Sequence, residues 1–210
     1  MLKLQWIRLV LVIAGVFMWV PAAAEVPSAL EAWEALVTST SEAGDEPVLG
    51  LVGFYGAPRP PQWLILTNTQ DESGVLRESV ISRGQVAAER KFSALPGQDV
   101  PDIAIPREEV NIDSVEAFRI AEATAKASWI SFDSVHYQLR CRDHGKEPIW
   151  MLSLMNSAQV SVGVIYLSAR SGEILRLRWQ DEPVEKHSSS MLGSVDVKTA
   201  RQAWRDLDRR

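Results

Sequence analysis

The chain has 210 residues, of which 22 are Lys or Arg and 27 are Asp or Glu, so its formal net charge is −5. Hydrophobic residues make up 46% and charged residues 23%, which excludes wholesale disorder and a collagen-like repeat. The negative charge argues against a dedicated nucleic-acid binder, which needs a basic surface, and against attachment to anionic lipid by charge alone. A single cysteine excludes an internal disulfide framework and a Cys-rich zinc site.

Residues 1–24 have the layout of a secretory signal peptide. Lys3 and Arg8 precede an uninterrupted apolar run at 9–20, and a proline separates this run from three alanines. The run is shorter than the about 20 residues that a transmembrane helix needs, although an uncleaved anchor is the alternative. We predict cleavage ahead of Glu25, an extracytoplasmic location (periplasmic or secreted), and no stable membrane anchor in the mature chain.

Capping signals mark the start of two predicted helices. Ser28 precedes Glu31 at the spacing of a capping box, and apolar side chains then recur at helical spacing. Asp113 precedes Glu116 in the same way, followed by a less regular apolar stripe. The sequence therefore predicts one helix after Ser28 and another after Asp113.

After each predicted helix, the apolar pattern changes to the two-residue alternation of half-buried strands. Val135, Tyr137, Leu139 and Cys141, for example, alternate with polar residues. Segments rich in turn-forming residues separate the strands. The predicted strands are 48–55, 62–67, 76–82 and 86–92 in the first half, and 134–142, 149–155, 159–168 and 173–180 in the second.

The two halves indicate a degenerate internal repeat. A constant offset aligns Trp63 with Trp150, and nearly the same offset relates the two helix starts. We therefore predict an α+β fold of two degenerate repeats, each a helix packed on an antiparallel β-meander, plus a C-terminal helix. The predicted units are a signal peptide (1–24), a first repeat (25–92), a Pro-containing connector (93–112), a second repeat (113–180), and a tether with an amphipathic C-terminal helix (181–210).

Both faces of the strand at 149–155 are apolar, so we expect an element on each side of the second sheet. Trp150 and Leu152 face one way, and Ile149 and Met151 face the other. One helix covers only one face, so something else must bury the second face. We expect the C-terminal helix or the first repeat to lie there, with a partner molecule as the third candidate.

A strand and a turn in the second half carry a family resemblance. The turn residues are Ser168, Ala169, Arg170, Ser171, Gly172, Glu173 and Ile174. Together with the segment 148–152, they resemble the PepSY domain family, in which an Asp-Ala-x-Thr-Gly-Glu-Val turn closes a small helix-on-sheet module. The resemblance spans 113–179 and reaches the first half only through the repeat. It implies an exported, non-catalytic binding or inhibitory module, as in propeptides of secreted peptidases, and it transfers no catalytic residue.

No residue pattern points to catalysis, a cofactor or a metal. The three His residues are scattered, and nucleotide-binding and serine-hydrolase motifs are absent. Cys141 and His144 lie three residues apart, but Cys141 shares the apolar side of its strand and is predicted to be buried, whereas His144 lies in the turn beyond. We therefore expect a protein that is not an enzyme and has no cofactor or metal site.

Six polar side chains form the candidate partner-binding face. They alternate with apolar residues on two predicted strands, so they leave the sheet on its outer side. If these strands are close together, they form a basic patch on an acidic protein that suits an acidic partner. The alternative is a solvated sheet face on which long Arg stems cover apolar surface. The six residues are His136, Gln138, Arg140, Arg142, Arg176 and Arg178.

These patterns favour binding over catalysis. We expect an exported module that acts on a peptidase, another envelope protein or a peptide. The alternative is an extracytoplasmic small-molecule carrier or sensor with a cleft between the repeats. A hydrolase ranks third, because no nucleophile–base pair is identifiable.

Overall fold

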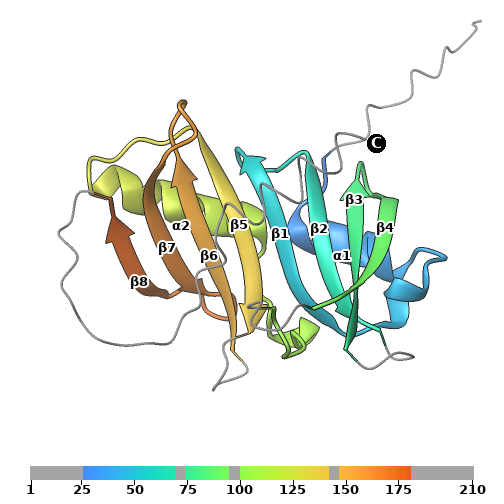
Figure 1. Cartoon of the computed structure of the whole chain (residues 1–210). Coiled ribbons are helices and arrows are strands. Elements are labelled where there is room, and N and C mark those ends of the chain that lie inside the picture. The colour runs from blue at the N-terminus through green and yellow to red at the C-terminus, as the bar shows by residue number, and fades with distance from the viewer. Residues whose placement is uncertain (1–25, 70–73, 95–99, 142–146, 181–210) are drawn as a thin grey trace, which may run out of the picture.

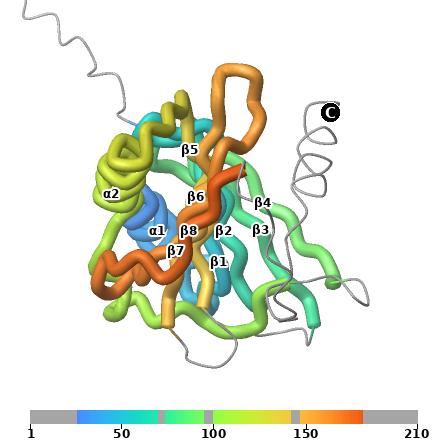
Figure 2. The backbone as a smooth tube through the Cα atoms, turned by 90° about the vertical axis from the view of Figure 1, so that its left-hand side faces the viewer, coloured from blue at the N-terminus to red at the C-terminus, as the bar shows by residue number. Residues whose placement is uncertain are grey.

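The computed structural model describes residues 26–69, 74–94, 100–141 and 147–180. Along the chain, an α-helix and four strands are followed by a second α-helix and four more strands. All eight strands belong to one antiparallel sheet, in the order β4-β3-β2-β1-β5-β6-β7-β8. Both helices lie on the same face of this sheet (Figures 1 and 2).

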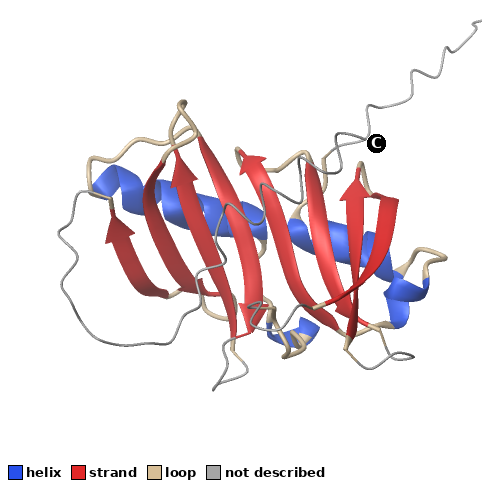
Figure 3. Cartoon of the chain, viewed as in Figure 1, coloured by secondary structure: helices blue, strands red, loops and turns tan. Residues whose placement is uncertain are grey.

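The first four strands form one side of the sheet and the last four form the other, as the labels of Figure 1 show for the view repeated in Figure 3. Their positions agree with the predicted strands to within a few residues, because strand positions follow local apolar patterns. The strands are β1 (Val48–Gly56), β2 (Gln62–Asn68), β3 (Val75–Ser82), β4 (Gln85–Ser93), β5 (Ser134–Cys141), β6 (Pro148–Met155), β7 (Ser161–Ser168) and β8 (Ile174–Trp179).

The helices α1 (Ala29–Val37) and α2 (Ser114–Ala127) begin directly after the two predicted capping residues. At α1, the Ser28 hydroxyl accepts from the backbone N–H of Glu31, and the Glu31 carboxylate accepts from the backbone N–H of Ser28. This reciprocal pair completes the predicted capping box. Asp113 also caps its own helix, but its carboxylate accepts from the N–H of the next residue.

The predicted fold class is wrong. We expected two helix-on-meander repeats plus a C-terminal helix, whereas the structure is mainly one eight-stranded antiparallel sheet with two short helices. The strand groups merge because β1 pairs with β5, with Leu51 opposite Leu139. Each of these strands is the edge of its own group, and pairing satisfies the backbone groups that an edge exposes. The C-terminal helix predicted within 181–210 lies outside the described residues.

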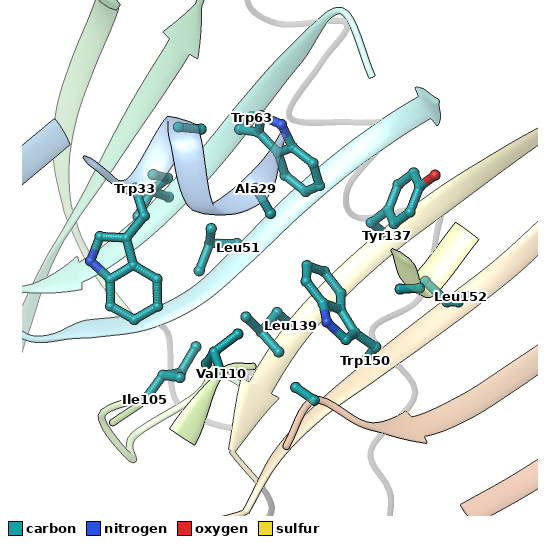
Figure 4. Close-up of a cluster of buried hydrophobic side chains, with 14 of the residues drawn as sticks. Ala29, Trp33, Leu51, Trp63, Ile105, Val110, Tyr137, Leu139, Trp150 and Leu152 are labelled. Carbon is teal, nitrogen blue, oxygen red and sulfur yellow. The ribbon is translucent and has the colours of Figure 1, made fainter. Parts of the chain in front are cut away.

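A buried aromatic cluster fills the junction between the two strand groups (Figure 4). Trp63, Tyr137 and Trp150 are at most 1% exposed, and their ring centroids lie 5.6, 6.2 and 6.4 Å apart. The indole N–H of Trp63 donates to the carbonyl of Pro27, and that of Trp150 donates to the carbonyl of Ile112. The hydrophobic core is therefore continuous from one half of the sheet to the other.

The amino ends of α1 and α2 meet at this junction. The buried hydroxyl of Ser114, the first residue of α2, accepts from the backbone N–H of Ala29, the first residue of α1, at 3.0 Å. The amino end of a helix carries unsatisfied N–H groups and a partial positive charge, so two such ends need acceptors between them. Ser114 supplies one of these acceptors.

Of the two elements expected to cover the second face of the C-terminal strands, the first half does not lie there, and the C-terminal helix lies outside the described residues. The first half extends the sheet edge to edge, and both helices pack against one face, so neither helix covers the opposite face of β5–β8 (Figure 2). The connector contributes Ile105 and Val110 to the core, where they are 4% and 3% exposed. The face opposite the helices is therefore a candidate for contact with other molecules.

Candidate binding face

We call the face of the sheet opposite the helices the open face. This face carries the candidate site. Side chains alternate between the two faces of a strand, so the neighbours of core residues lie on the open face. In β5, Tyr137 and Leu139 are core residues, which places Gln138 on the open face. Residues opposite each other in neighbouring strands share a face, so the open face can be followed from strand to strand.

One row of side chains crosses the open face through all eight strands. Each member is the registered partner of the next, and most members are apolar and half-buried. The solvated face of an antiparallel sheet is ordinarily polar, so an apolar row on this face indicates a surface for contact. From β4 to β8, the row consists of Ala88, Val80, Leu64, Val52, Gln138, Met151, Tyr166 and Arg176.

Arginines border the apolar row in the second half of the sheet. Arg176 and Arg178 are exposed on β8, and neither makes an ion pair or a hydrogen bond with another described residue. Arg140 lies in the neighbouring row, opposite Gly50 of β1 and Ile149 of β6. The strands β5–β8 contain no Asp or Glu. These strands therefore place arginines and no acidic residue on the open face, although the chain as a whole is acidic.

An aromatic cluster lies next to the apolar row, where β1 meets β5. The ring of His136 meets Phe54 and Tyr55 edge to face, with centroid distances of 5.1 and 4.6 Å. Tyr55 is 46% exposed, and its φ of 59° lies in the left-handed region that side chains other than glycine seldom adopt. Backbone strain of this kind concentrates at functional sites. Tyr55 therefore joins the row as a candidate contact residue.

The position of Tyr55 depends on an irregularity between β1 and β5. The register of the two strands shifts between Gly53 and Gly56, and such bulges change the direction of a side chain. A Cβ atom at Gly53 would lie 2.7 Å from the ring of Pro60, and one at Gly56 would lie 2.6 Å from the ring of Tyr137. Both positions therefore require glycine, and the residue between them that carries the exposed ring is Tyr55.

The structure does not bring the six predicted face residues together. The strands β6 and β7 separate β5 from β8, so Arg176 and Arg178 do not join the β5 residues in one compact patch. His136 and Gln138 are only 7% and 9% exposed, so they form the floor of the open face. Arg140 is half-buried, and Arg142 lies outside the described residues.

Sequence reasoning missed the part of the row that belongs to the first half. Val52, Leu64 and Val80 are half-buried on the open face. The sequence does contain a signal for a second apolar face on β2. Leu64 lies between the core residues Trp63 and Ile65, so the strand is apolar on both faces. Only the pairing of β1 with β5 shows that these residues continue the row of the second half.

Cys141 is placed for structure and not for nucleophilic chemistry. It is 5% exposed, and its thiol donates to the carbonyl oxygen of Ala104 at 3.5 Å. Burial, and then the charge of Glu109, raise the pKa of Cys141 to about 11. The thiol is therefore protonated at neutral pH, and the protonated form is a poor nucleophile.

The described ranges contain neither a metal-binding cluster nor a membrane-spanning helix. No group of three or more His, Cys, Asp or Glu residues within them is arranged to hold a metal ion. In the same part of the chain, no helix combines the length and the apolar character needed to cross a membrane.

Comparison with known proteins identifies no match for this chain. No protein-family model matches it, and neither a curated protein nor a solved structure is significantly similar to it. The geometry and chemistry of the open face are therefore the basis for the functional proposal.

Proposed function

We propose that the protein is an exported, non-catalytic binding module that engages an acidic protein or peptide through the open face of its sheet. The observation that carries the proposal is the mainly apolar row that crosses all eight strands and ends at Arg176. A folded partner that covers this row removes its apolar side chains from water. This burial is worth about 25 cal/mol per Å².

The charges of the open face favour an acidic partner. Arg176 and Arg178 on β8 are exposed at the end of the row, and the strands β5–β8 contain no acidic side chain. Complementary charges at the rim of an interface increase the association rate and select against partners of the wrong charge. Carboxylates of the partner next to Tyr166 and Met151 would pair with these arginines.

The proposed resemblance to PepSY modules rests on the turn between β7 and β8. The hydroxyl of Ser168 accepts from the backbone N–H groups of Arg170 and Ser171, each at 3.2 Å. An Asp carboxylate at this position in the family motif is suited to the same role. Gly172 has a φ of 76°, which requires glycine. Because the resemblance implies modules such as the propeptides of secreted peptidases, a secreted peptidase is the first partner class to test.

The alternative of a small-molecule carrier receives less support. That alternative requires a cleft between the two halves, and the junction is filled by Trp63, Tyr137 and Trp150. Export is part of the proposal and rests on the signal-like layout of residues 1–24. N-terminal sequencing of the protein from the envelope fraction is expected to begin at Glu25, and retention of residues 1–24 would contradict export by cleavage.

Quantitative affinity capture from the envelope fraction of the host tests the binding proposal. The wild type is compared with the double variant Arg176→Glu/Arg178→Glu and with the control variant Arg119→Glu. Arg119 lies on α2, which packs on the other face of the sheet. The control variant therefore reverses a charge away from the open face. We expect a captured protein that binds the wild type and the control but is lost with the double variant.

Direct measurement with the purified partner completes the test. Tyr166→Ala is expected to weaken binding by about tenfold or more, as loss of an aromatic contact at an interface does. If the partner is a peptidase, the wild type is expected to inhibit it and the double variant to inhibit it less. Equal capture by all three proteins would refute the open face as the binding surface.

A further inference from the structure

The end of α2 carries an exposed tryptophan in an unfavourable backbone conformation. Trp129 is 96% exposed and has a φ of 59°. The N–H of Trp129 donates to the carbonyl of Lys126 at 3.1 Å, and the N–H of Ile130 donates to that of Ala125 at 2.9 Å. These two bonds form a Schellman motif, in which the left-handed position is usually occupied by glycine. Packing within the described chain gives no reason for an indole at this position.

Trp129 borders a shallow groove that runs along α2 and has a volume of about 370 Å³. The rings of Phe118 and Phe132 meet edge to face in it, with centroids 5.7 Å apart. Glu122 and Lys126 are exposed beside it, and neither makes an ion pair with a described residue. One surface therefore contains an apolar projection, an apolar groove and two opposite charges.

We propose that this surface binds a second copy of the same chain, with Trp129 of each copy in the groove of the other. A two-fold contact needs a surface that is complementary to itself, so the projection and the groove must lie on the same patch. The end of α2 meets this requirement. The proposal is independent of the open face, which lies on the other side of the sheet (Figure 2).

The spacing of the charges supports an antiparallel arrangement of two α2 helices. Glu122 and Lys126 are equally distant in sequence from Thr124. If the two-fold axis crosses α2 midway between Glu122 and Lys126, on the side of the helix that carries both, Glu122 of each copy lies opposite Lys126 of the other, and both pairs are attractive. The same axis brings Trp129 of one copy toward Phe118 of the other, where the apolar groove begins.

The small size of the surface predicts a weak and reversible dimer. Each copy contributes only one groove and one helix end, whereas stable interfaces bury about 1,200 Å² or more and involve about 20–30 residues on each side. We therefore expect a dissociation constant of roughly 100 µM, which corresponds to an interface with few anchor residues.

Analytical ultracentrifugation of the purified full chain from about 5 µM to about 1 mM brackets this affinity. The weight-average mass is expected to rise from that of a monomer toward that of a dimer. Trp129→Ala and Trp129→Gly are each expected to remain monomeric. The matched control is Val37→Ala, at the end of α1, because Val37 is also an exposed apolar residue, at 52%. This control is expected to dimerise like the wild type.

Charge reversal tests the antiparallel arrangement itself. Glu122→Lys and Lys126→Glu are each expected to weaken dimerisation by about tenfold, because each places like charges opposite one another. The double variant Glu122→Lys/Lys126→Glu restores opposite charges across the two-fold axis and is expected to recover the wild-type affinity. A merely destabilising effect of the single variants would not be reversed in this way.

Several results would overturn the proposal. A monomer at every concentration does so, as does a dimer that survives Trp129→Ala. A dimer that is lost in Arg176→Glu/Arg178→Glu and kept in Trp129→Ala would place self-association on the open face. A monomer in which Trp129 is needed to bind a different protein would assign the groove to that protein.

Discussion

The carboxylate of Asp113 accepts a hydrogen bond from the backbone N–H of Leu30 at 3.1 Å. A side chain that precedes α2 therefore also supplies an acceptor for an N–H group at the amino end of α1. The same oxygen accepts from the N–H of Ser114 at 2.6 Å. One negative charge therefore lies between two helix amino ends, each of which carries a partial positive charge. This contact joins the two halves of the molecule on the helix side of the sheet.

Asp113→Ala is expected to lower the free energy of unfolding by about 2 kcal/mol, because it removes an acceptor from two helix amino ends. Chemical denaturation measures this loss. Asp113→Asn is the matched control, since its amide oxygen still accepts while the charge is removed. Its expected loss is about 0.5–1 kcal/mol. Equal stability of Asp113→Ala and the wild type would show that the contact contributes nothing.

Trp129→Gly is expected to raise the free energy of unfolding by about 1 kcal/mol. Glycine adopts the left-handed conformation of this position without strain, whereas a residue with a Cβ atom does not. The exposed indole contributes little packing that would be lost. Lys126→Gly serves as the control, because this residue lies within α2, where glycine destabilises by about 1 kcal/mol. A loss of stability in Trp129→Gly would indicate that the indole packs within the chain.

Cys141 is expected to make the free energy of unfolding decrease as the pH rises through the alkaline range. The pKa of its thiol is raised from the ordinary 9.0 to about 11, first by burial and then by the charge of Glu109. The unfolded chain therefore loses this proton before the folded chain does. The contribution of the protonated thiol to the stability of the folded state is complete below pH 9 and is lost as the pH rises toward 11. In Cys141→Ala, which has no thiol, denaturation curves are expected to show a smaller decline over this range.

Thiol labelling gives an independent measurement at Cys141. A bulky disulfide reagent is expected to react slowly with the native protein near pH 8 and rapidly after unfolding, because the side chain is 5% exposed and protonated. Cys141→Ser is expected to lose about 1–3 kcal/mol if the shorter hydroxyl does not reach the carbonyl of Ala104. Rapid labelling of the native protein would contradict the buried position.

The pair formed by Arg77 and Glu46 offers a test of a buried ionic contact. The side chains are 9% and 7% exposed, and Nη2 of Arg77 lies 2.9 Å from Oε1 of Glu46. Arg77→Leu is expected to lose about 3–5 kcal/mol, because it leaves the buried Glu46 without a charged partner. Glu46→Leu is expected to lose less, because Arg77 keeps its ion pair with Glu42 at 2.8 Å. The double variant is expected to lose less than the sum of the two. Additive losses would show that the pair is not coupled.

Features that depend on neighbouring residues follow from the sequence alone. The capping box needs only Ser28 and Glu31, which lie three residues apart, and it forms as predicted. The alternation in β5 correctly places Cys141 in the core, since neighbouring side chains of a strand must point to opposite faces. The turn between β7 and β8 also follows from local chemistry, because Gly172 adopts a positive φ.

The merger of two strand groups into one sheet is decided by tertiary structure. The pairing of Leu51 with Leu139 joins residues that are far apart in the chain, and no local pattern selects this edge over the outer edges β4 and β8. The same pairing assembles the row across the open face and places β6 and β7 between β5 and β8. The candidate face therefore differs from the one predicted, because periodicity assigns a residue to a face of its strand, while strand order decides which residues lie together on that face.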